Sequence, residues 1–286
     1  MLNDFEKPYI TVTDHLVSGE TFQLFSNGAG SILKTVPQPA EEDLAKYYES
    51  DAYISHTDGK KGIVPLLYQT VKKHTLKKKV SLITNLNNGA GTVLDVGAGT
   101  GDFLNSAQQK GWGVFGVEVN EKAKQLATLK NIKMESSLSA FKNKTFDVIT
   151  LWHVLEHIPN LGETIAQLKE LLVKNGTLII AVPNYNSFDA KYYKQFWAAY
   201  DVPRHLWHFS RKGLPKLLAP NFSLEKIKPM FFDSFYVSLL SEKYRSQRSF
   251  SVRALCVGFW SNISAWRTKE YSSHIYCFKK EPEVHL

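Results

Sequence analysis

Residues 92–104 read TVLDVGAGTGDFL, in which an apolar run leads into a glycine-rich turn. The run at 92–96 predicts a buried strand. Three glycines follow it on alternate positions: Gly97, Gly99 and Gly101. Glycines at this spacing allow a tight turn and let the backbone approach a ligand closely. The stretch therefore predicts a nucleotide-binding loop.

The residues around the glycines narrow the kind of ligand. The dinucleotide fingerprint G-x-G-x-x-G is not met, because Asp102 stands where its third glycine should be. The phosphate-binding Walker loop is not met either, because no Gly-Lys-Ser/Thr follows the glycines. Asp95, near the end of the strand, disfavours a phosphate and favours a cationic or hydroxyl-rich ligand.

Strand and helix patterns alternate from residue 92 onwards. Apolar runs predict strands at 92–96, 112–118, 131–135, 146–151 and 177–183. Helical spacing predicts helices at 101–110, 120–130 and 161–173. This alternation with short loops is typical of βαβ units, so we expect an α/β fold with a parallel sheet.

The two flanks of this region are less regular. Residues 1–62 contain strand-like pieces, turn signals and one short helix that begins near Ala40. Residues 63–86 predict a helix with a solvated lysine face: Lys72, Lys73, Lys77, Lys78 and Lys79. An aromatic-rich connection without a clear period spans 184–210. The remainder predicts a helix at 211–219, a strand at 222–229, a mostly helical stretch at 232–268 and a final strand at 271–280.

Composition sets limits on the class of protein. The chain has 286 residues, a net charge of +8 and only two cysteines, Cys256 and Cys277. Two cysteines make neither a disulfide framework nor a zinc site of their own. The N-terminus lacks a signal-peptide pattern and no stretch predicts a membrane span, so we expect a soluble, cytoplasmic protein. The positive charge is compatible with nucleic acid or anionic lipid as a partner, or with a basic surface that has none.

At this point the sequence resembles the class I S-adenosylmethionine-dependent methyltransferases. VLDVGAGTGDFL resembles their first motif, and FDVITLWHVLEHIPN and NGTLIIAVPN resemble their fourth- and fifth-strand blocks. LAKYYESDAYISHTD and DAKYYKQFWAAYDVPRHLWHFS resemble segments of one bacterial small-molecule branch. Many of those relatives carry two cysteines where this chain has Ser26 and Ala29, so we expect no zinc-bearing N-terminus.

The resemblance implies a Rossmann-like, seven-stranded, mostly parallel sheet with helices on both faces and an antiparallel last strand. It implies an N-terminal cap segment and helix at 1–86 and a methyltransferase domain at 87–286. A helical insertion at about 232–268 would precede the last strand. We expect this apolar and arginine-rich insertion to cap the substrate pocket, to form a dimer contact, or to lie on a membrane surface.

The resemblance also implies S-adenosylmethionine as the cofactor and a set of contacts to it. The glycine loop would lie against the methionine and ribose: Gly97, Ala98, Gly99 and Gly101. Asp95 would reach the cofactor ammonium, Glu118 would hold both ribose hydroxyls, and Val119 would pack on adenine. The pocket mouth and the cap would add Trp152, His153 and one of Tyr48, Tyr53 or His56. The adenine amine would meet Ser136, Ser137 or the backbone of Leu138, because the acidic residue usual there is missing.

A histidine near neutral pKa suits removal of a proton from a hydroxyl or amine acceptor. The candidates are His153, His157, His205 and His208. We favour His205 as general base, with His208 and Asp201 beside it, because DVPRHLWHFS follows the sheet where α/β folds bind ligands. Hydrogen bonds that merely hold this loop together are the alternative. His153 and His157 lack a third ligand in the sequence, so we expect no metal.

Aromatic residues before this loop would line an apolar substrate cavity: Tyr192, Tyr193, Phe196, Trp197 and Tyr200. The prediction is methyl transfer to a small-molecule or lipid-like acceptor, with oxygen favoured. One alternative is an RNA or other nucleic-acid methyltransferase, although the Asp/Asn-Pro-Pro-aromatic motif is replaced by LWHV. Another is a non-catalytic module that binds S-adenosylmethionine.

Overall fold

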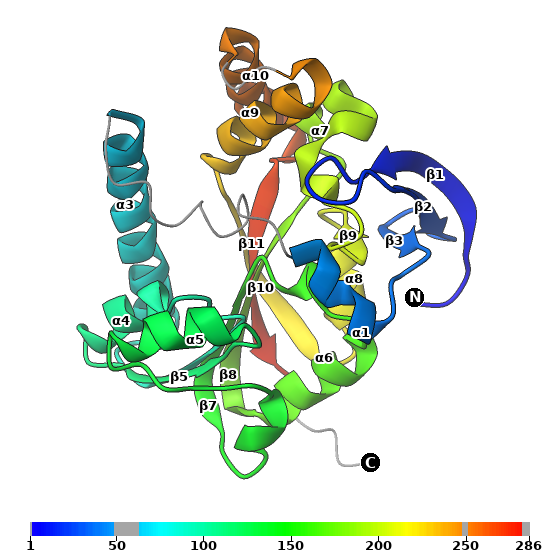
Figure 1. Cartoon of the computed structure of the whole chain (residues 1–286). Coiled ribbons are helices and arrows are strands. Elements are labelled where there is room, and N and C mark those ends of the chain that lie inside the picture. Colours follow the sequence, from blue (N-terminus) through cyan, green and yellow to red (C-terminus); the bar gives the residue numbers. More distant parts are fainter. Residues whose placement is uncertain (1, 49–62, 248–250, 282–286) are drawn as a thin grey trace.

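The computed structural model describes residues 2–48, 63–247 and 251–281, and within them the chain forms two sheets flanked by helices (Figure 1). The larger sheet has seven strands in the order β10-β11-β8-β7-β4-β5-β6. Their bounds are β4 (Thr92–Val96), β5 (Gly113–Val117), β6 (Met134–Glu135), β7 (Phe146–Trp152), β8 (Leu172–Pro183), β10 (Phe222–Pro229) and β11 (Ser273–Lys280). Strands β4 to β8 pair in parallel, whereas β11 pairs antiparallel to both β8 and β10. The predicted Rossmann-like fold is confirmed.

Alternating side chains of the central strands pack into two separate hydrophobic cores, one on each face of the sheet. One face packs on α3 (Ile63–Leu86) and α4 (Asp102–Gln108) and includes Val93, Val148 and Ile179. The other face packs on α6 (Leu161–Glu170) and α8 (Gly213–Leu218) and includes Leu94, Ile149 and Leu178. Neighbouring residues of a strand point to opposite faces, so near-continuous apolar strands are what a sheet covered on both sides requires. Helix α5 (Glu121–Thr128) connects β5 to β6.

The lysine face predicted for α3 is only partly correct. Lys73, Lys77 and Lys78 are exposed, as expected. Lys72 instead forms an ion pair of 2.6 Å with Asp102 at the start of α4. The ammonium of Lys79 lies 4.2 Å from the centroid of the Trp152 ring, at the end of β7. The sequence pattern missed this, because a lysine stem can pass over apolar surface while its charge reaches a polar site.

The N-terminal region and the DVPRHLWHFS loop form the second sheet, in the order β1-β2-β3-β9. Its strands are β1 (Phe5–Thr13), β2 (Thr21–Asn27), β3 (Ile32–Val36) and β9 (Trp207–Phe209). All pair antiparallel, and Leu33 lies opposite His208. A three-residue strand is too short to show an alternating pattern, so 207–209 could not be recognised from sequence. α1 (Glu41–Leu44) and η1 (Ala45–Tyr48) follow β3.

The stretch at 232–268 forms two helices, α9 (Asp233–Ser246) and α10 (Val252–Thr268), at the top of Figure 1 beside α7 (Phe188–Tyr193). Asp189 of α7 is fully buried and accepts hydrogen bonds from Trp197, Ser261 of α10 and Ser272. These bonds fix the helix pair to the body of the protein. Within the described ranges, each helix is too short or too polar to cross a membrane.

Candidate active site

The loop after β4 has the backbone that its glycines predict. Gly97 and Gly99 have φ angles of 68° and 54°, a left-handed region that side chains disfavour. A side chain at Gly97 would overlap Val154, whereas the position of a Cβ on Gly99 has no atom within 4 Å. The amides of Gly97 and Ala98 donate to the carbonyl of Val117 at 2.8 and 3.0 Å. The loop is therefore tied to the end of β5 and leaves open space at Gly99.

Glu118 follows β5 and reaches this loop. One of its carboxylate oxygens, Oε2, accepts a hydrogen bond from the Gly99 amide at 2.7 Å. The other oxygen, Oε1, accepts one from the Asn120 amide at 2.9 Å. The neighbouring Val119 side chain is 78% exposed. A half-buried carboxylate with a fixed orientation thus stands beside the open glycine, where hydroxyl groups of a ligand can reach it.

Asp95 lies in the floor of the same region. Its side chain is buried and accepts a hydrogen bond of 2.5 Å from Thr150 of β7. Burial raises the pKa of Asp95 to about 7, although the Thr150 hydrogen bond and the Lys79 ammonium oppose the rise. Burial likewise lowers the pKa of Lys79 to about 8, against the attraction of Asp95 and Asp233. An acid and a base that both titrate near neutrality therefore meet at the ends of β4 and β7, as is common at functional sites.

His153 directly follows β7 and has a left-handed backbone, with φ of 59°. Its Nε2 lies 3.3 Å from Asp233 at the start of α9, and its Nδ1 lies 3.5 Å from Glu156. Burial alone would lower the pKa of His153, but these two carboxylates raise it to about 9. At neutral pH the ring is a cation, so His153 is unsuited to act as the base and instead links α9 to the site.

One ring nitrogen of His205 contacts a backbone carbonyl, and the other lies near a carboxylate. It is buried, and its Nδ1 lies 2.9 Å from the carbonyl of Ala199. A carbonyl only accepts, so Nδ1 carries the proton and Nε2 keeps its lone pair in the neutral ring. Nε2 lies 3.9 Å from Asp201, and the ring packs edge-on against His157 with centroids 4.5 Å apart. A proton on Nε2 would therefore face the Asp201 carboxylate.

His157 belongs to η3 (Leu155–His157), beside the same loop. Its Nδ1 lies 3.0 Å from the Arg204 carbonyl and 3.0 Å from the Tyr48 hydroxyl. Burial and the neighbouring His205 lower the pKa of His157 to about 4, so the ring is neutral over the physiological range. Tyr48, proposed above as a cofactor contact of the cap, has its hydroxyl on this histidine. Tyr53 and His56 lie outside the described residues.

Asp201 also takes part in a buried ion-pair network. The guanidinium of Arg204 is 1% exposed and lies 2.7 Å from Asp201 and 3.0 Å from Asp14. It also donates to the carbonyl of Tyr47. Burial alone would raise the pKa of both carboxyls, but Arg204 holds the pKa of Asp201 below its usual value. The hydrogen bond from the Ser18 amide, followed by Arg204, does the same for Asp14. This network connects the N-terminal sheet to the DVPRHLWHFS loop.

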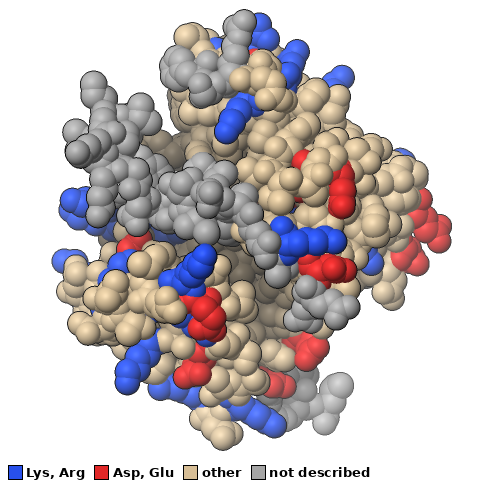
Figure 2. Space-filling view, in the orientation of Figure 1, with Lys and Arg blue, Asp and Glu red and all other residues tan. Residues whose placement is uncertain are grey.

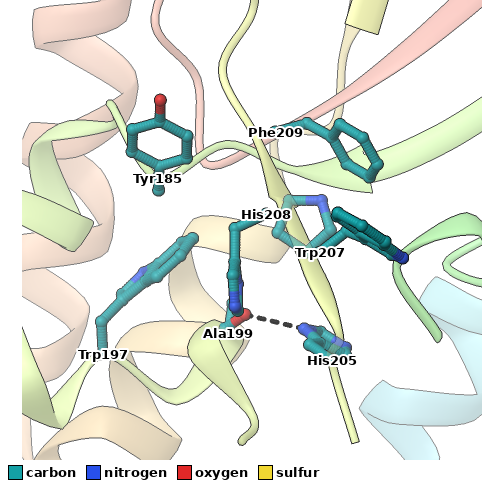
Figure 3. A pocket seen from close by; sticks show the side chains of 8 residues that line it. Tyr185, Trp197, Ala199, His205, Trp207, His208 and Phe209 are labelled. Atoms are coloured by element: carbon teal, nitrogen blue, oxygen red, sulfur yellow. Dashed lines mark hydrogen bonds between the residues drawn. The ribbon is translucent and has the colours of Figure 1, made fainter. Parts of the chain in front are cut away.

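His208 is buried on β9, and its Nε2 lies 3.0 Å from the Thr35 hydroxyl. Burial and His205 lower its pKa well below the usual value. A small aromatic pocket lies between these histidines and β8 (Figure 3). It is lined by Pro183, Tyr185, Trp197, Ala199, His205, Trp207, His208 and Phe209. Among the five aromatic residues predicted to line a cavity, Trp197, Tyr193 and Tyr200 are buried in one hydrophobic cluster, and Trp197 also lines this pocket.

The serines predicted to contact adenine lie after β6. The Ser136 hydroxyl accepts a hydrogen bond of 2.7 Å from Lys124 of α5, and Ser137 contacts Ser139 at 2.7 Å. Leu138 begins η2 (Leu138–Phe141). The Trp152 indole nitrogen is buried beneath Lys79 and has no hydrogen-bond partner within the described part of the chain.

One group of side chains has donor atoms suited to a cation. Glu156, His157 and His205 each place a possible ligand atom within 4.8 Å of the other two. The Glu156 side chain is 1% exposed. One of its carboxylate oxygens lies 3.5 Å from His153 Nδ1. Burial raises and His153 lowers the pKa of Glu156, and the net direction is downward. The expectation that no metal binds remains a prediction.

Three residues of the site were missed from sequence. Lys79 was assigned to a solvated face, Glu156 was treated only as part of the LEHIP block, and Asp233 was treated only as part of the insertion. The 3.6-residue period would have placed Lys79 on the same side of α3 as the partly buried Leu76 and the buried Ile83, which was a usable signal. The contact of Asp233 with His153, 80 positions earlier, had no local signal.

Comparison with known proteins gives a family for this arrangement. A profile of the methyltransferase-domain family matches residues 68–221, more than half of the chain. The ubiquinone biosynthesis O-methyltransferase of Nitrosomonas europaea is 28% identical over 106 residues, which are 33% of this chain and 45% of that protein. The protein of the same name from Nitrosospira multiformis is 31% identical over 104 residues, 33% of this chain and 44% of that one. The chain therefore spans less than half the length of these relatives.

Solved structures share the fold. Magnesium protoporphyrin IX methyltransferase from Synechocystis PCC 6803, with S-adenosylhomocysteine bound, matches 84% of this chain and 100% of its own with a TM-score of 0.55 and 16% identity. The 1,6-didemethyltoxoflavin-N1-methyltransferase of Burkholderia thailandensis matches 97% of this chain and 100% of its own with a TM-score of 0.53 and 16% identity. At these identities the likeness concerns the fold alone.

Proposed function

Because this chain belongs to the methyltransferase-domain family, with S-adenosylmethionine as its methyl donor, we propose that it methylates a small-molecule or lipid-like acceptor, at oxygen. The observation that carries the acceptor chemistry is His205, whose Nε2 keeps a lone pair beside Asp201. The O-methyltransferase names of the curated relatives support the choice of oxygen.

In this proposal two of the cofactor residues, Glu118 and Asp95, keep the roles predicted from sequence. Glu118, already fixed beside Gly99, would hold the ribose diol, and Asp95 would attract the ammonium group. Lys79 adds a cation within reach of a ligand carboxylate at the end of β7. Residues 1–86 would act as the cap, and the insertion at 232–268 would act as a lid through Asp233.

The chain's own contribution to the chemistry is orientation and proton removal. The donor supplies an activated methyl group on a sulfonium, which becomes a neutral thioether when the carbon–sulfur bond breaks and the new carbon–oxygen bond forms. His205 Nε2 would accept the hydroxyl proton of the acceptor, and Asp201 would stabilise the resulting imidazolium. His153, a cation at neutral pH, would hold α9 over the site through Asp233.

Replacing His205 by alanine tests this assignment. We expect kcat to fall by about 100-fold or more, because a positioned base contributes on the order of 10²–10⁴-fold. The affinity for S-adenosylmethionine should stay within about twofold, since in this proposal His205 would contact the acceptor and not the cofactor. Steady-state kinetics and calorimetry measure the two quantities.

The matched control is His74→Ala, which removes an exposed histidine of α3 and should leave both quantities unchanged. Full turnover in the His205→Ala protein would show that His205 is not the base.

Metal analysis of the same wild-type preparation should find less than one equivalent of transition metal. A stoichiometric metal that is lost in Glu156→Gln would instead make Glu156, His157 and His205 a cation site.

Cofactor affinity should depend on pH through Asp95. Its pKa is raised to about 7, so the carboxylate is lost as the pH falls through that value. A protonated Asp95 cannot attract the ammonium, and we expect binding at pH 6 to be weaker than at pH 7.5 by roughly tenfold. Calorimetric titration at the two pH values measures this. The Asp95→Asn protein should bind weakly at both, and a wild-type affinity independent of pH would contradict the assignment.

Nucleic acid is the second candidate acceptor, favoured by the net charge of +8. Binding to RNA that weakens steeply with salt, together with methyl label in RNA, would support that alternative. A module that binds S-adenosylmethionine without reacting is the third candidate, and it would return the bound cofactor unchanged.

A further inference from the structure

The helix pair α9–α10 and the turn before it expose an unusual number of large apolar side chains. Eight of the fifteen such side chains in the described part of the protein fall between residues 231 and 266. They are Phe231, Phe232, Tyr236, Val252, Leu255, Phe259, Trp260 and Trp266. Exposed apolar groups are ordinary when scattered, but a concentration of this kind marks an interaction surface.

Helix α10 has its large residues on the outside and its small residues on the inside. Its buried positions are Ala254, Val257, Gly258, Ser261 and Ala265. Val252, Leu255, Phe259 and Trp266 are exposed by 66%, 38%, 59% and 66%. At 100° per residue these four fall within an arc of about 60°, whose centre lies about 140° around the helix from the centre of the buried face. The helix therefore presents a continuous apolar stripe away from the body of the protein.

The inner face of α10 explains why the small residues are there. A side chain on Gly258 would come within 2.9 Å of Phe235 of α9. The hydroxyl of Ser234 donates to the Gly258 carbonyl at 3.0 Å, and Ser261 donates to buried Asp189. Close packing and hydrogen bonds thus fix the orientation of α10, so the outward direction of the apolar stripe is built in.

The charges next to the stripe are mainly basic, although the Arg253 guanidinium lies 3.7 Å from the buried Glu242 of α9. From Lys243 to Lys269 the sequence contains basic residues and no Asp or Glu. Arg253 and Arg267 both lie along one edge of the stripe on α10, at about 100° and 60° from Val252 around the helix axis. Figure 2 shows Lys and Arg side chains around the upper end of the molecule, where the two helices lie. The partner should therefore be apolar and anionic.

We propose that the α9–α10 pair docks on the surface of an anionic lipid bilayer, with α10 in the plane of the headgroups. An aromatic and aliphatic stripe bordered by arginine and lysine is the pattern of an interfacial helix. A second copy of the chain is a poor occupant, because two surfaces of the same positive charge would face each other. Nucleic acid would satisfy the charges but leave Phe259 and Trp266 in water.

This surface is connected to the site, because α9 begins at Asp233, 3.3 Å from His153. A docked helix pair would place the end of the sheet next to the bilayer. The inference rests on the proposed lipid-like acceptor for its biological purpose, but the binding itself does not require that proposal. The proposed partner is a lipid surface, and the proposed acceptor is a molecule that partitions into that surface.

Co-sedimentation of the whole protein with vesicles tests the proposal. We expect binding to phosphatidylcholine vesicles that contain phosphatidylglycerol, and binding weaker by about tenfold or more to phosphatidylcholine alone. High salt should reduce binding to the anionic vesicles. The double variant Phe259→Ser/Trp266→Ser should bind them about tenfold less tightly or worse. Arg253→Gln/Arg267→Gln should lose most of the preference for anionic lipid.

The matched control is Leu129→Ser, which changes a side chain that is 81% exposed after α5 and should bind vesicles like the wild type. Unchanged circular dichroism and S-adenosylmethionine affinity in each variant separate loss of docking from loss of fold or of the proposed function. Absence of wild-type binding to the anionic vesicles would overturn the proposal. Equal binding of wild type and the Phe259/Trp266 variant would also overturn it, as would self-association or RNA binding in place of lipid binding.

Discussion

Replacing Glu118 by alanine is expected to weaken the binding of S-adenosylmethionine by about 100-fold or more. A hydrogen bond to a charged group contributes on the order of 1.5–3 kcal/mol, and the carboxylate can accept two from a ribose diol. The loss should be larger than that of the ligand contacts alone, because Glu118 also accepts from the Gly99 and Asn120 amides. Calorimetric titration of the purified variant measures the change.

Glu121→Ala provides the matched control for charge. Glu121 is three residues further on, largely exposed, and paired with Lys124. Its loss should leave cofactor affinity within about twofold, since exposed ion pairs contribute little. If the Glu118 variant bound S-adenosylmethionine as tightly as the wild type, the placement of the ribose beside Gly99 would be wrong.

Replacing Arg204 by methionine is expected to have the largest effect on stability. Removing one partner of a buried ion pair costs about 3–5 kcal/mol, because the remaining charges stay buried without compensation. Here both Asp14 and Asp201 would lose their cation. Denaturant unfolding should show a corresponding drop in the free energy of unfolding.

A double variant distinguishes loss of the ion-pair interaction from loss of side-chain packing. Asp14→Asn should destabilise the Arg204→Met protein less than it destabilises the wild type, because the two residues interact directly. Arg267→Met, at an exposed position of α10, is the control and should have little effect. Additive effects of the two network substitutions would show that the ion pair does not couple the N-terminal sheet to the loop.

Local patterns were enough to predict a parallel sheet and the glycine loop, whereas the number of strands and the antiparallel last strand came from the family resemblance. The strand at 92–96 and the helix at 63–86 have the bounds that periodicity predicted, because both are long or strongly apolar. The pairing of β9 with β3 was not predictable, since His208 and Leu33 are 175 positions apart and β9 has three residues. Lys79 was misassigned because the aliphatic part of its side chain can cover apolar surface while its ammonium group reaches a polar site. Only the tertiary fold decides where that ammonium group lies.

For the candidate catalytic residues, too, the local sequence was informative and the tertiary surroundings were not predictable. A histidine-rich loop after the sheet was visible in the sequence, and His205 stands there with a free lone pair on Nε2. The state of each ring was not visible, because it depends on distant groups. Asp233 makes His153 a cation, and burial beside His205 keeps His157 neutral.

The most direct test of the account is a single-turnover assay with S-adenosylmethionine that carries a tritiated methyl group. The protein should form one S-adenosylhomocysteine per site only when an extract containing the acceptor is added. The label should then appear in an organic-soluble small molecule and withstand treatment with ribonuclease. Bound cofactor recovered unchanged with every extract, or label recovered in RNA, would contradict the account.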